Sequence, residues 1–130
     1  MSTKLITVGL DDRLTTVKNI FENQDIHHIL VVEANELFGI VSDFDLYKAL
    51  SPNIGMRSET LKDAATINKQ VHQIMSRNPI TLGPDATIRD AVNIFCDHSF
   101  TCIPIVSHEK KPLGIVTVRD IMRALKDMKK

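Results

Sequence analysis

Two short motifs place a hydroxyl three residues ahead of a carboxylate: Ser42 with Asp45, and Thr117 with Asp120. Each motif follows an apolar run and precedes a helical pattern, so both groups should lie where a strand ends and a helix begins. An ionised carboxylate can accept two hydrogen bonds at once, which suits the adjacent hydroxyls of a ribose. A helix N-terminus also offers free N–H groups to a phosphate. The motifs are therefore candidate ribose and phosphate contacts.

The same spacing also has a purely structural explanation. In a capping box, a Ser or Thr side chain binds the first helical turn, and an acidic side chain three residues later binds back to the cap. Both motifs would start a helix, so their repetition does not separate the two explanations. Each motif is a capping box, a ligand site, or both.

The second motif contains Arg119, and the first carries Phe44 at the same place. The Arg119 guanidinium could pair with a phosphate, and it is otherwise a solvated surface group. Phe44 is expected to pack against other apolar side chains, although its ring could also stack on a base. The two motifs should therefore differ in what they bind.

His27 and His28 come directly before an apolar run, Ile29–Val32. A protonated imidazole here could contact a phosphate, which makes His28 a candidate contact. Affinity for the ligand should then fall between pH 6 and pH 8 as the imidazole loses its proton. The alternative is a partly exposed pair with no role in binding.

The other three histidines and the two cysteines form no recognised metal-ligand spacing, so we expect no metal site. These residues are His72, His98, His108, Cys96 and Cys102. Two cysteines without a secretory leader also predict buried, reduced thiols rather than a disulfide.

No catalytic motif is visible. The chain has no nucleophile–base set, no G-x-x-x-x-G-K-[ST] phosphate loop and no G-x-G-x-x-G turn. We therefore expect that the protein is not an enzyme and that it requires no cofactor.

The 130-residue chain has a formal net charge of +0, with 16 Lys and Arg residues against 16 Asp and Glu residues. Because it has no basic excess, one Tyr and no Trp, nucleic acid is not an expected partner. No apolar run approaches the roughly 18 residues of a membrane span. The first residues, MSTKLITVGL, lack the pattern of a signal peptide. We expect a soluble, cytoplasmic protein.

The chain repeats itself. Three blocks recur in the same order, with one extra residue in the second copy between Val106 and Gly114. They are 1–14 with 75–88, 28–32 with 102–106, and 39–50 with 114–125. Blocks that recur in one order with a single shift indicate two copies of one structural unit.

Each copy predicts the same elements, β-α-β-β-α, from short Val- and Ile-rich runs and from apolar residues at helical spacing. Asp11-Asp12 and Asp85 are expected to start the first helix of each copy. The predicted strands are 6–8, 29–32 and 37–42, then 80–82, 103–106 and 113–117. The predicted helices are 14–21, 44–50, 58–68, 88–95 and 119–128, with a short helical segment at 71–75.

We therefore expect an α+β protein in three parts: a first repeat at 1–50, a connector at 51–70 and a second repeat at 71–130. A copy of about fifty residues is marginal alone. The two copies should pack through their sheets with pseudo-two-fold symmetry and fold as one cooperative unit.

The element order and the repeated G-h-h-[ST]-x-x-D motif (h is apolar) resemble a CBS-domain pair, or Bateman module. The motif spans Gly39–Asp45 and Gly114–Asp120, and Ile74–Thr81 is similar to the family's usual lead-in to a repeat. Within the family, the chain most resembles stand-alone bacterial pairs of the acetoin-utilisation (AcuB) type.

The resemblance implies a regulatory module that binds AMP, ADP, ATP or S-adenosylmethionine in clefts between the repeats and acts on a separate protein partner. It implies ribose contacts at Asp45 and Asp120. It implies ribose or phosphate contacts at Ser42 and Thr117. Family members often form homodimers, and some bind no nucleotide, so a ligand-free dimerisation module is the alternative.

The resemblance also implies that the first strands offer backbone groups to an adenine edge, around Thr7, Ile80 and Thr81. His27-His28 occupy the place of a His-Arg pair that faces phosphates in gamma subunits of AMP-activated protein kinase. The first copy departs from the family pattern, because Leu5 and Leu30 stand where the second copy has Pro79 and Pro104. A ligand site in the first copy is therefore the less expected of the two.

Overall fold

Residues 5–50 and 68–128 are described in the computed structural model. Contacts divide the described chain into two units. Among the described residues, the N-terminal unit contains 6–34, 38–50 and 68–78, and the C-terminal unit contains Leu5, 35–37 and 79–128. The expected helix at 58–68 falls almost entirely outside the described residues.

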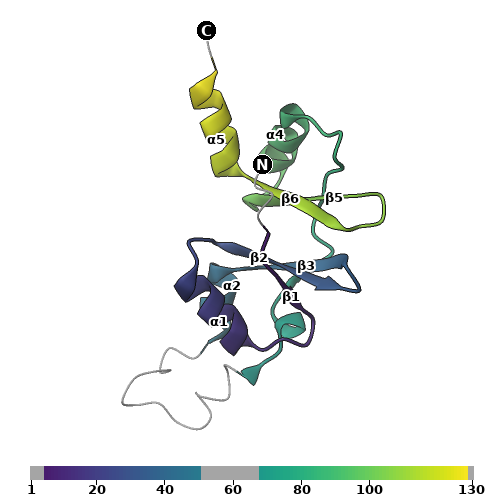
Figure 1. Ribbon diagram of the computed structural model, residues 1–130. Helices are drawn as coiled ribbons and strands as arrows, with labels where there is room; N and C mark the ends of the chain where they lie inside the picture. Colours follow the sequence, from purple (N-terminus) through teal and green to yellow (C-terminus); the bar gives the residue numbers. More distant parts are fainter. Residues whose placement is uncertain (1–4, 51–67, 129–130) are drawn as a thin grey trace. The chain divides into compact units, whose positions relative to one another are not determined.

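The N-terminal unit is a small sheet with its helices on one side (Figure 1). Its elements are β1 (Thr7–Gly9), α1 (Leu14–Asn23), β2 (His28–Glu33), β3 (Glu36–Ser42), α2 (Asp43–Ala49), the 3-10 turn η2 (Val71–Gln73) and β4 (Ser76–Arg77). The strand order is β1-β2-β3-β4, with β1 parallel to β2 and β3 antiparallel to β4. The predicted strands 6–8, 29–32 and 37–42 correspond to β1, β2 and β3 with ends shifted by one residue, and β4 was not predicted.

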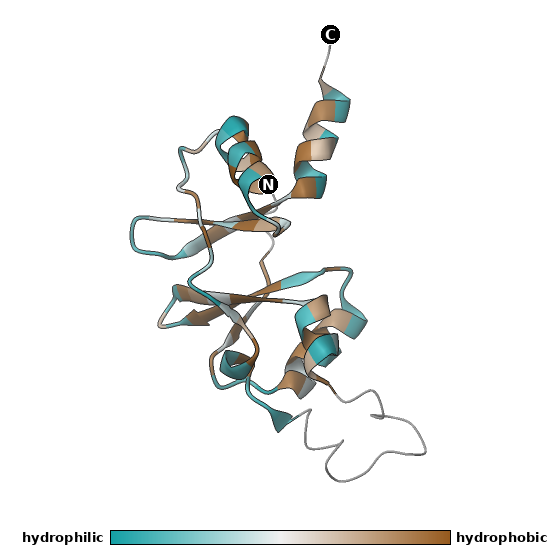
Figure 2. Ribbon diagram, turned by 180° about the vertical axis from the view of Figure 1, so that it is seen from behind, coloured by the Kyte–Doolittle hydropathy of each residue, from teal (hydrophilic) through white to brown (hydrophobic). Residues whose placement is uncertain are grey.

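The core of this unit comes from apolar residues on one face of each element. Its buried members are Val8, Leu14, Val17, Ile29, Val31, Val41, Leu46 and Val71. Figure 2 shows the apolar residues concentrated in the strands. The tight β2–β3 turn places Ala34 and Asn35 at positive φ, 50° and 66°, as two-residue hairpin turns require.

The segment before the second repeat packs on this unit. The backbone N–H of Val71 donates to the Asp12 carbonyl (2.7 Å), and that of His72 donates to the Leu10 carbonyl (3.1 Å). Val71 is fully buried. Residues 69–75 therefore close the N-terminal core from outside the first repeat.

Gly39 on β3 lies against the same segment. A Cβ at Gly39 would come within 2.6 Å of the Met75 sulphur and 2.8 Å of the Ser76 carbonyl oxygen. The close approach of β3 and β4 thus requires glycine here.

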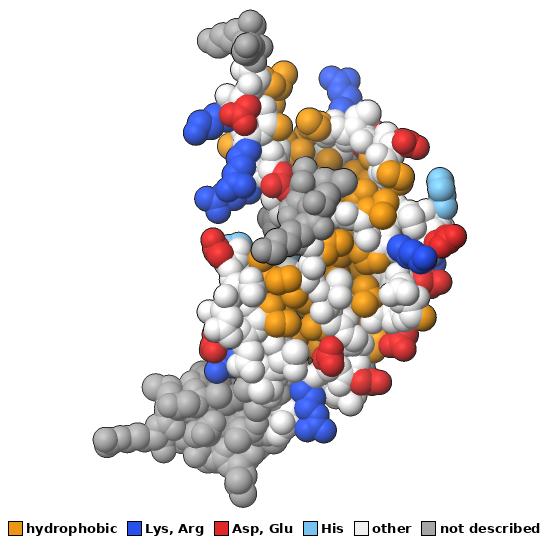
Figure 3. Space-filling model, in the orientation of Figure 1, with side chains coloured by type: hydrophobic (Ala, Val, Ile, Leu, Met, Phe, Trp, Pro, Cys, Tyr) orange, Lys and Arg blue, Asp and Glu red, His pale blue; other side chains and the backbone are white. Residues whose placement is uncertain are grey.

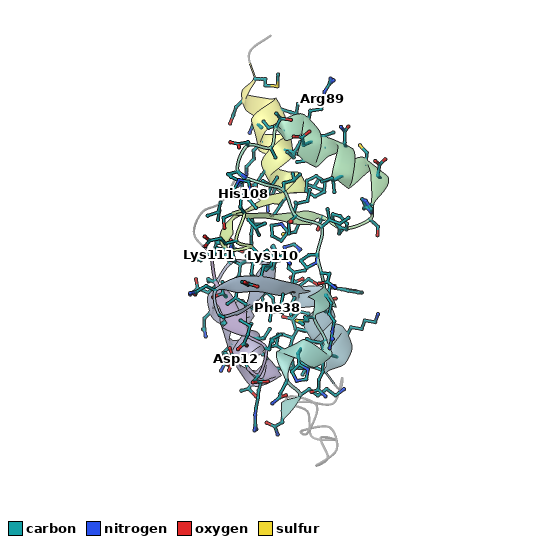
Figure 4. The ribbon with its side chains drawn as sticks, turned by 90° about the vertical axis from the view of Figure 1, so that its right-hand side faces the viewer. Asp12, Phe38, Arg89, His108, Lys110 and Lys111 are labelled. Carbon is teal, nitrogen blue, oxygen red and sulfur yellow. The ribbon has the colours of Figure 1, made fainter. Side chains whose placement is uncertain are left out.

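The C-terminal unit contains α4 (Ile88–Asp97), β5 (Cys102–Val106), β6 (Pro112–Thr117) and α5 (Val118–Asp127). The antiparallel β5–β6 register shifts between Ile105 and Val106, so that Leu113 is skipped. This bulge falls where the second copy carries its extra residue. Figure 4 labels His108, Lys110 and Lys111 on the turn that joins the two strands.

The first strand of the second copy is shorter than predicted. Of residues 80–82, Leu82 alone forms a bridge, parallel to Ile105. Its backbone N–H donates to the Pro104 carbonyl at 3.1 Å, and its carbonyl accepts from Val106 at 2.9 Å. The expected strand is reduced to this one residue.

The expected helix starts at Asp11-Asp12 and Asp85 were wrong. The N-cap of α1 is Arg13, without a side-chain cap, and Asp12 instead accepts a hydrogen bond from the Gly9 N–H at 2.7 Å. Figure 4 labels Asp12 in this turn. The cap of α4 is Thr87, two residues beyond Asp85. All three aspartates precede the helices, which begin after the caps Arg13 and Thr87.

No helix among the described residues is long and apolar enough to cross a membrane.

Candidate functional site

Ser42 and Asp45 join β3 to α2 through two reciprocal hydrogen bonds. The Ser42 hydroxyl accepts from the Asp45 N–H at 3.0 Å, and Asp45 Oδ2 accepts from the Ser42 N–H at 3.0 Å. The strand exit and the first helical turn are therefore held in one fixed arrangement.

Thr117 and Asp120 repeat this arrangement between β6 and α5. The Thr117 hydroxyl accepts from the Asp120 N–H at 3.1 Å, and Asp120 Oδ2 accepts from the Thr117 N–H at 2.9 Å. The capping-box explanation is thus confirmed for both motifs. In each carboxylate the cap uses Oδ2, and Oδ1 is the second acceptor that a ligand hydroxyl would need.

A third capping box shows what the Ser/Thr-x-x-Asp spacing indicates where no ligand is expected. Thr87 and Asp90 form the same pair of bonds at the start of α4, at 3.2 Å and 2.9 Å, and both residues are exposed. No candidate ligand role attaches to this pair. The pattern alone therefore marks a helix start, and a ligand site needs further support.

Charge differs between the two motifs. The first turn of α2 carries Asp43 as well as Asp45, and Asp43 Oδ2 lies 2.8 Å from His27 Nδ1. The first turn of α5 carries Asp120 as its one acidic residue and the exposed Arg119 beside it. The second motif is therefore the more favourable surrounding for a phosphate.

His28 is less suited to a phosphate than its position in the sequence indicated. Burial is the main cause that lowers its pKa from 6.5, with a smaller contribution from His27, and the carboxylates of Asp43 and Asp45 oppose the shift. The imidazole is therefore mostly neutral at neutral pH, and it attracts a phosphate weakly.

The two residues that differ between the motifs both lie at the surface. Phe44 is 70% exposed, so the expectation that it packs against other apolar side chains was wrong for most of its surface. Arg119 is exposed, as a solvated or ligand-facing group would be. Phe44 lies in the capped first turn of α2, and the apolar contact of this helix with the core is made by Leu46, which is fully buried.

The cysteines divide into one buried and one exposed thiol. Cys102 on β5 pairs with Thr117 and is buried, and burial together with the charge of Asp120 raises its pKa to about 12. Cys96 is exposed near the end of α4, so its expected burial was wrong. The buried face of α4 includes Ala91.

The remaining candidate contacts lie on the leading segments of the two copies. Thr7 is exposed on β1, and Ile80 is 38% exposed ahead of Leu82, with Thr81 half-buried between them. Thr7 belongs to the unit of Ser42, whereas Ile80 and Thr81 belong to the unit of Thr117. Their proposed contact with an adenine stays a prediction.

The C-terminal unit also contains a pocket of about 290 Å³ between the start of α4, α5 and the strands. Asp120 is the one ionisable side chain among its described lining residues. Several lining residues are small, and their short side chains leave the pocket open; they include Gly83, Ala86, Ala91 and Ala124. Sequence reasoning missed the pocket, and the available signal was Ala91 standing where the first copy has Val17.

Within residues 5–50 and 68–128, no three His, Cys, Asp or Glu side chains gather in a way that could hold a metal ion.

Comparison with known proteins decides the family. The CBS domain profile matches residues 1–52 and 71–127. The chain belongs to the CBS domain family. The two matched ranges coincide with the two copies of the sequence repeat, so the predicted α+β tandem pair is confirmed.

Two solved CBS pairs share this fold over nearly the whole chain. One is the CBS domain pair of protein MJ0100 in complex with 5′-methylthioadenosine and S-adenosyl-L-methionine. It has a TM-score of 0.81 and 25% identity, over 99% of this chain and 94% of that one. The other is a putative acetoin utilization protein (AcuB) from Vibrio cholerae. It has a TM-score of 0.78 and 23% identity, over 98% and 87% of the chains. The resemblance to the AcuB type is therefore supported at the level of fold.

Some relatives carry the pair inside a longer protein. The inosine-5′-monophosphate dehydrogenase of Korarchaeum cryptofilum is 26% identical over 90% of this chain, which spans 21% of that protein. The chain spans less than half the length of several curated relatives that it matches.

Proposed function

We propose that this CBS pair is a regulatory module that binds an adenosine-containing ligand and acts on a separate protein partner. The observation that carries the proposal is the half-buried Asp120 at the junction between β6 and α5, in contrast to the exposed Asp90 of the third capping box. The cap holds the Asp120 carboxylate beside a helix N-terminus, with one oxygen committed to the cap. MJ0100, the CBS pair with a TM-score of 0.81, holds two adenosine-containing ligands, which supports the ligand class.

Thr117 and Asp120 form the primary site in this proposal, with Arg119 available to a phosphate and with Ile80 and Thr81 at the adenine edge. The second motif is preferred because Asp43 adds a negative charge beside Asp45 in the first motif. Ser42, Asp45, Thr7 and His28 then form a weaker site. Phosphate-bearing ligands should prefer the second motif, and the protein itself has no catalytic role.

The alternative function is assembly without a ligand. Helices α2 and α5 each expose large apolar side chains, among them Phe44 (70%) and Tyr47 (60%) on α2, and Met122 (62%) and Leu125 (56%) on α5. Figure 3 shows hydrophobic side chains at the surface of the C-terminal unit. Exposed apolar groups of this kind favour a symmetric dimer.

A matched pair of variants tests the ligand site. Asp120→Asn and Asp90→Asn each replace the carboxylate of a capping box, but Asp90 has no proposed ligand role. Calorimetric titration with AMP, ADP, ATP and S-adenosylmethionine should detect at least one ligand. Asp120→Asn should lower the affinity for that ligand at least tenfold because one charge and one acceptor are lost. Asp90→Asn should leave the affinity unchanged.

Failure of all four ligands to bind at millimolar concentration would favour the assembly alternative. An equal loss of affinity in the two variants would assign Asp120 to the helix cap alone.

A further inference from the structure

The first residue of the first helix is buried in one copy and exposed in the other. Leu14, at the start of α1, is fully buried, whereas its counterpart Ile88, at the start of α4, is 57% exposed. Both residues occupy the first helical position of their helix. The difference therefore lies in what covers them.

In the N-terminal unit the cover is the segment around η2. Val71 belongs to the buried core, and Ile74 and Met75 pack against it. Backbone hydrogen bonds also hold the segment in place. The Lys69 carbonyl accepts from the Leu14 N–H at 2.9 Å, and the Val71 N–H donates to the Asp12 carbonyl at 2.7 Å. One helical turn with apolar side chains at its first, fourth and fifth positions thus completes this core.

In the C-terminal unit the same face lines the pocket of about 290 Å³. Its lining includes Leu82, Ile88, Ala91, Ile105, Val116 and Ile121. In the sequence repeat these residues align with Val8, Leu14, Val17, Val31, Val41 and Leu46. All six counterparts belong to the cluster that contains Val71.

We propose that this pocket is a docking groove for one helical turn of a partner protein, with apolar side chains in the Val71-His72-Gln73-Ile74-Met75 pattern. The internal repeat identifies the occupant, since the aligned face of the N-terminal unit holds such a turn. The carbonyls of Pro84 and Ala86 align with those of Leu10 and Asp12, which accept hydrogen bonds from the turn. The groove extends its host's core, as helix-in-groove recognition does.

The groove differs from the proposed nucleotide site. Of the candidate nucleotide contacts, Asp120 alone is among its described lining residues. The volume lies at the lower limit of small-molecule pockets, and the lining is mostly apolar. A few aliphatic side chains suit this space better than a nucleotide with its phosphates. Asp120 at the edge favours a partner with a basic or hydrogen-bond-donating residue beside the turn, as Lys69 and His72 are in the occupied copy.

The test uses the full chain and a labelled peptide of its own residues 68–76, NKQVHQIMS, as the probe. Fluorescence anisotropy should show saturable binding. A peptide with Val71→Asp and Ile74→Asp should bind at least tenfold more weakly, because both apolar anchors are lost.

Variants of the protein locate the binding. Gly83→Leu adds a side chain at the groove, where a Cβ would meet nothing within 4 Å, so the fold should tolerate it. Ala91→Leu fills the groove floor. Both should weaken peptide binding at least tenfold, whereas Asn93→Leu, an exposed change on the same helix outside the lining, should not. Gly83→Leu keeps the test valid if Ala91→Leu does not fold.

Four results would overturn the proposal. The first is that the peptide does not bind the parent protein, and the second is that it binds the two groove variants as tightly as the parent protein. The third is simple competition between AMP and the peptide, which would make the groove a nucleotide site. The fourth is self-association in sedimentation that Gly83→Leu removes, which would make a second copy the occupant. A parent protein that binds AMP but not the peptide would reject the groove and leave the proposed function standing.

Discussion

The N-terminal and C-terminal units come from the two copies of the sequence repeat, and they differ in how many strands pair and in how fully the core is covered. The N-terminal unit has a four-stranded sheet and a core sealed by Val71, a residue from outside its own repeat. The C-terminal unit pairs β5 with β6, adds a single bridge at Leu82 and keeps an open pocket. Similar sequence patterns therefore do not guarantee equally closed cores.

The difference in core coverage follows from where the covering segment lies along the chain. The segment between the copies is available to cover the first copy, and its N–H groups bind the carbonyls ahead of α1. The unit with a sealed core is suited to be a scaffold. The unit with the open pocket, the exposed Arg119 and one acidic group in its helix start is the one to which we assign binding.

The largest expected effect comes from comparing a charge on Val71, which covers the N-terminal core, with a charge on Ile88, the exposed residue at the start of α4. Val71→Asp buries an unpaired carboxylate in the N-terminal core and should lower the free energy of unfolding by about 3 kcal/mol or more. Ile88→Asp should change it by less than about 0.5 kcal/mol, because the side chain is 57% exposed. Urea denaturation followed by circular dichroism measures both. Equal losses would mean that the two faces are equally covered in solution.

Glycine substitutions sharpen the same contrast. Gly39→Ala should cost about 1–3 kcal/mol, since the new methyl group meets the Met75 sulphur and the Ser76 carbonyl. Gly83→Ala meets nothing within 4 Å and should be neutral or stabilise by up to about 1 kcal/mol. Melting temperatures of the two variants, compared with the parent, test this. A harmless Gly39→Ala would show that β3 and β4 are not in close contact.

The cysteines separate a buried position from an exposed one within the C-terminal unit. At pH 8 a thiol reagent should modify Cys96 at once and Cys102 only after unfolding. The pKa of Cys102 rises from 9.0 to about 12 on folding, so the folded state holds the proton more tightly. Stability should therefore fall as the pH rises above about 9, by up to about 1.4 kcal/mol per pH unit.

Cys102→Ala should remove this alkaline slope, and Cys96→Ala should keep it. Rapid modification of both thiols in the folded protein would contradict the burial of Cys102.

The smallest expected effect concerns His28 in the N-terminal unit. Its pKa is lower in the folded state than the ordinary 6.5, so the unfolded state binds more protons just below pH 6.5. Stability should decrease as the pH falls through this range. His28→Gln should flatten the profile in urea titrations between pH 5 and pH 7. A profile that His28→Gln leaves intact would assign the slope to another group.

Much of this arrangement was predictable from the sequence. The repeated blocks located the helices and most strands of both copies. The one-residue shift was assigned to a turn, and the structure shows it as a bulge near Val106. The Ser/Thr-x-x-Asp spacing predicted both capping boxes, because that geometry depends on residues three apart. Local spacing is enough where the contact is local.

Other features depend on contacts between distant segments, which spacing does not contain. The 71–75 segment was predicted as helical, but its seat on the first copy depends on the path of the chain. Cys96 and Phe44 were assigned to buried positions by residue type, and the helix faces put both at the surface. The pocket lies beside Ile88, which is 57% exposed among the described residues, and one copy read alone gives no sign of it.

The number of ligands bound per chain tests the central claim most directly. Native mass spectrometry with the phosphate-bearing ligand that titration identifies should find one tight site per chain. Asp120→Asn should abolish it, and Asp45→Asn should leave it intact. Two sites of equal affinity, or loss of binding in Asp45→Asn with retention in Asp120→Asn, would contradict the assignment of binding to the C-terminal unit.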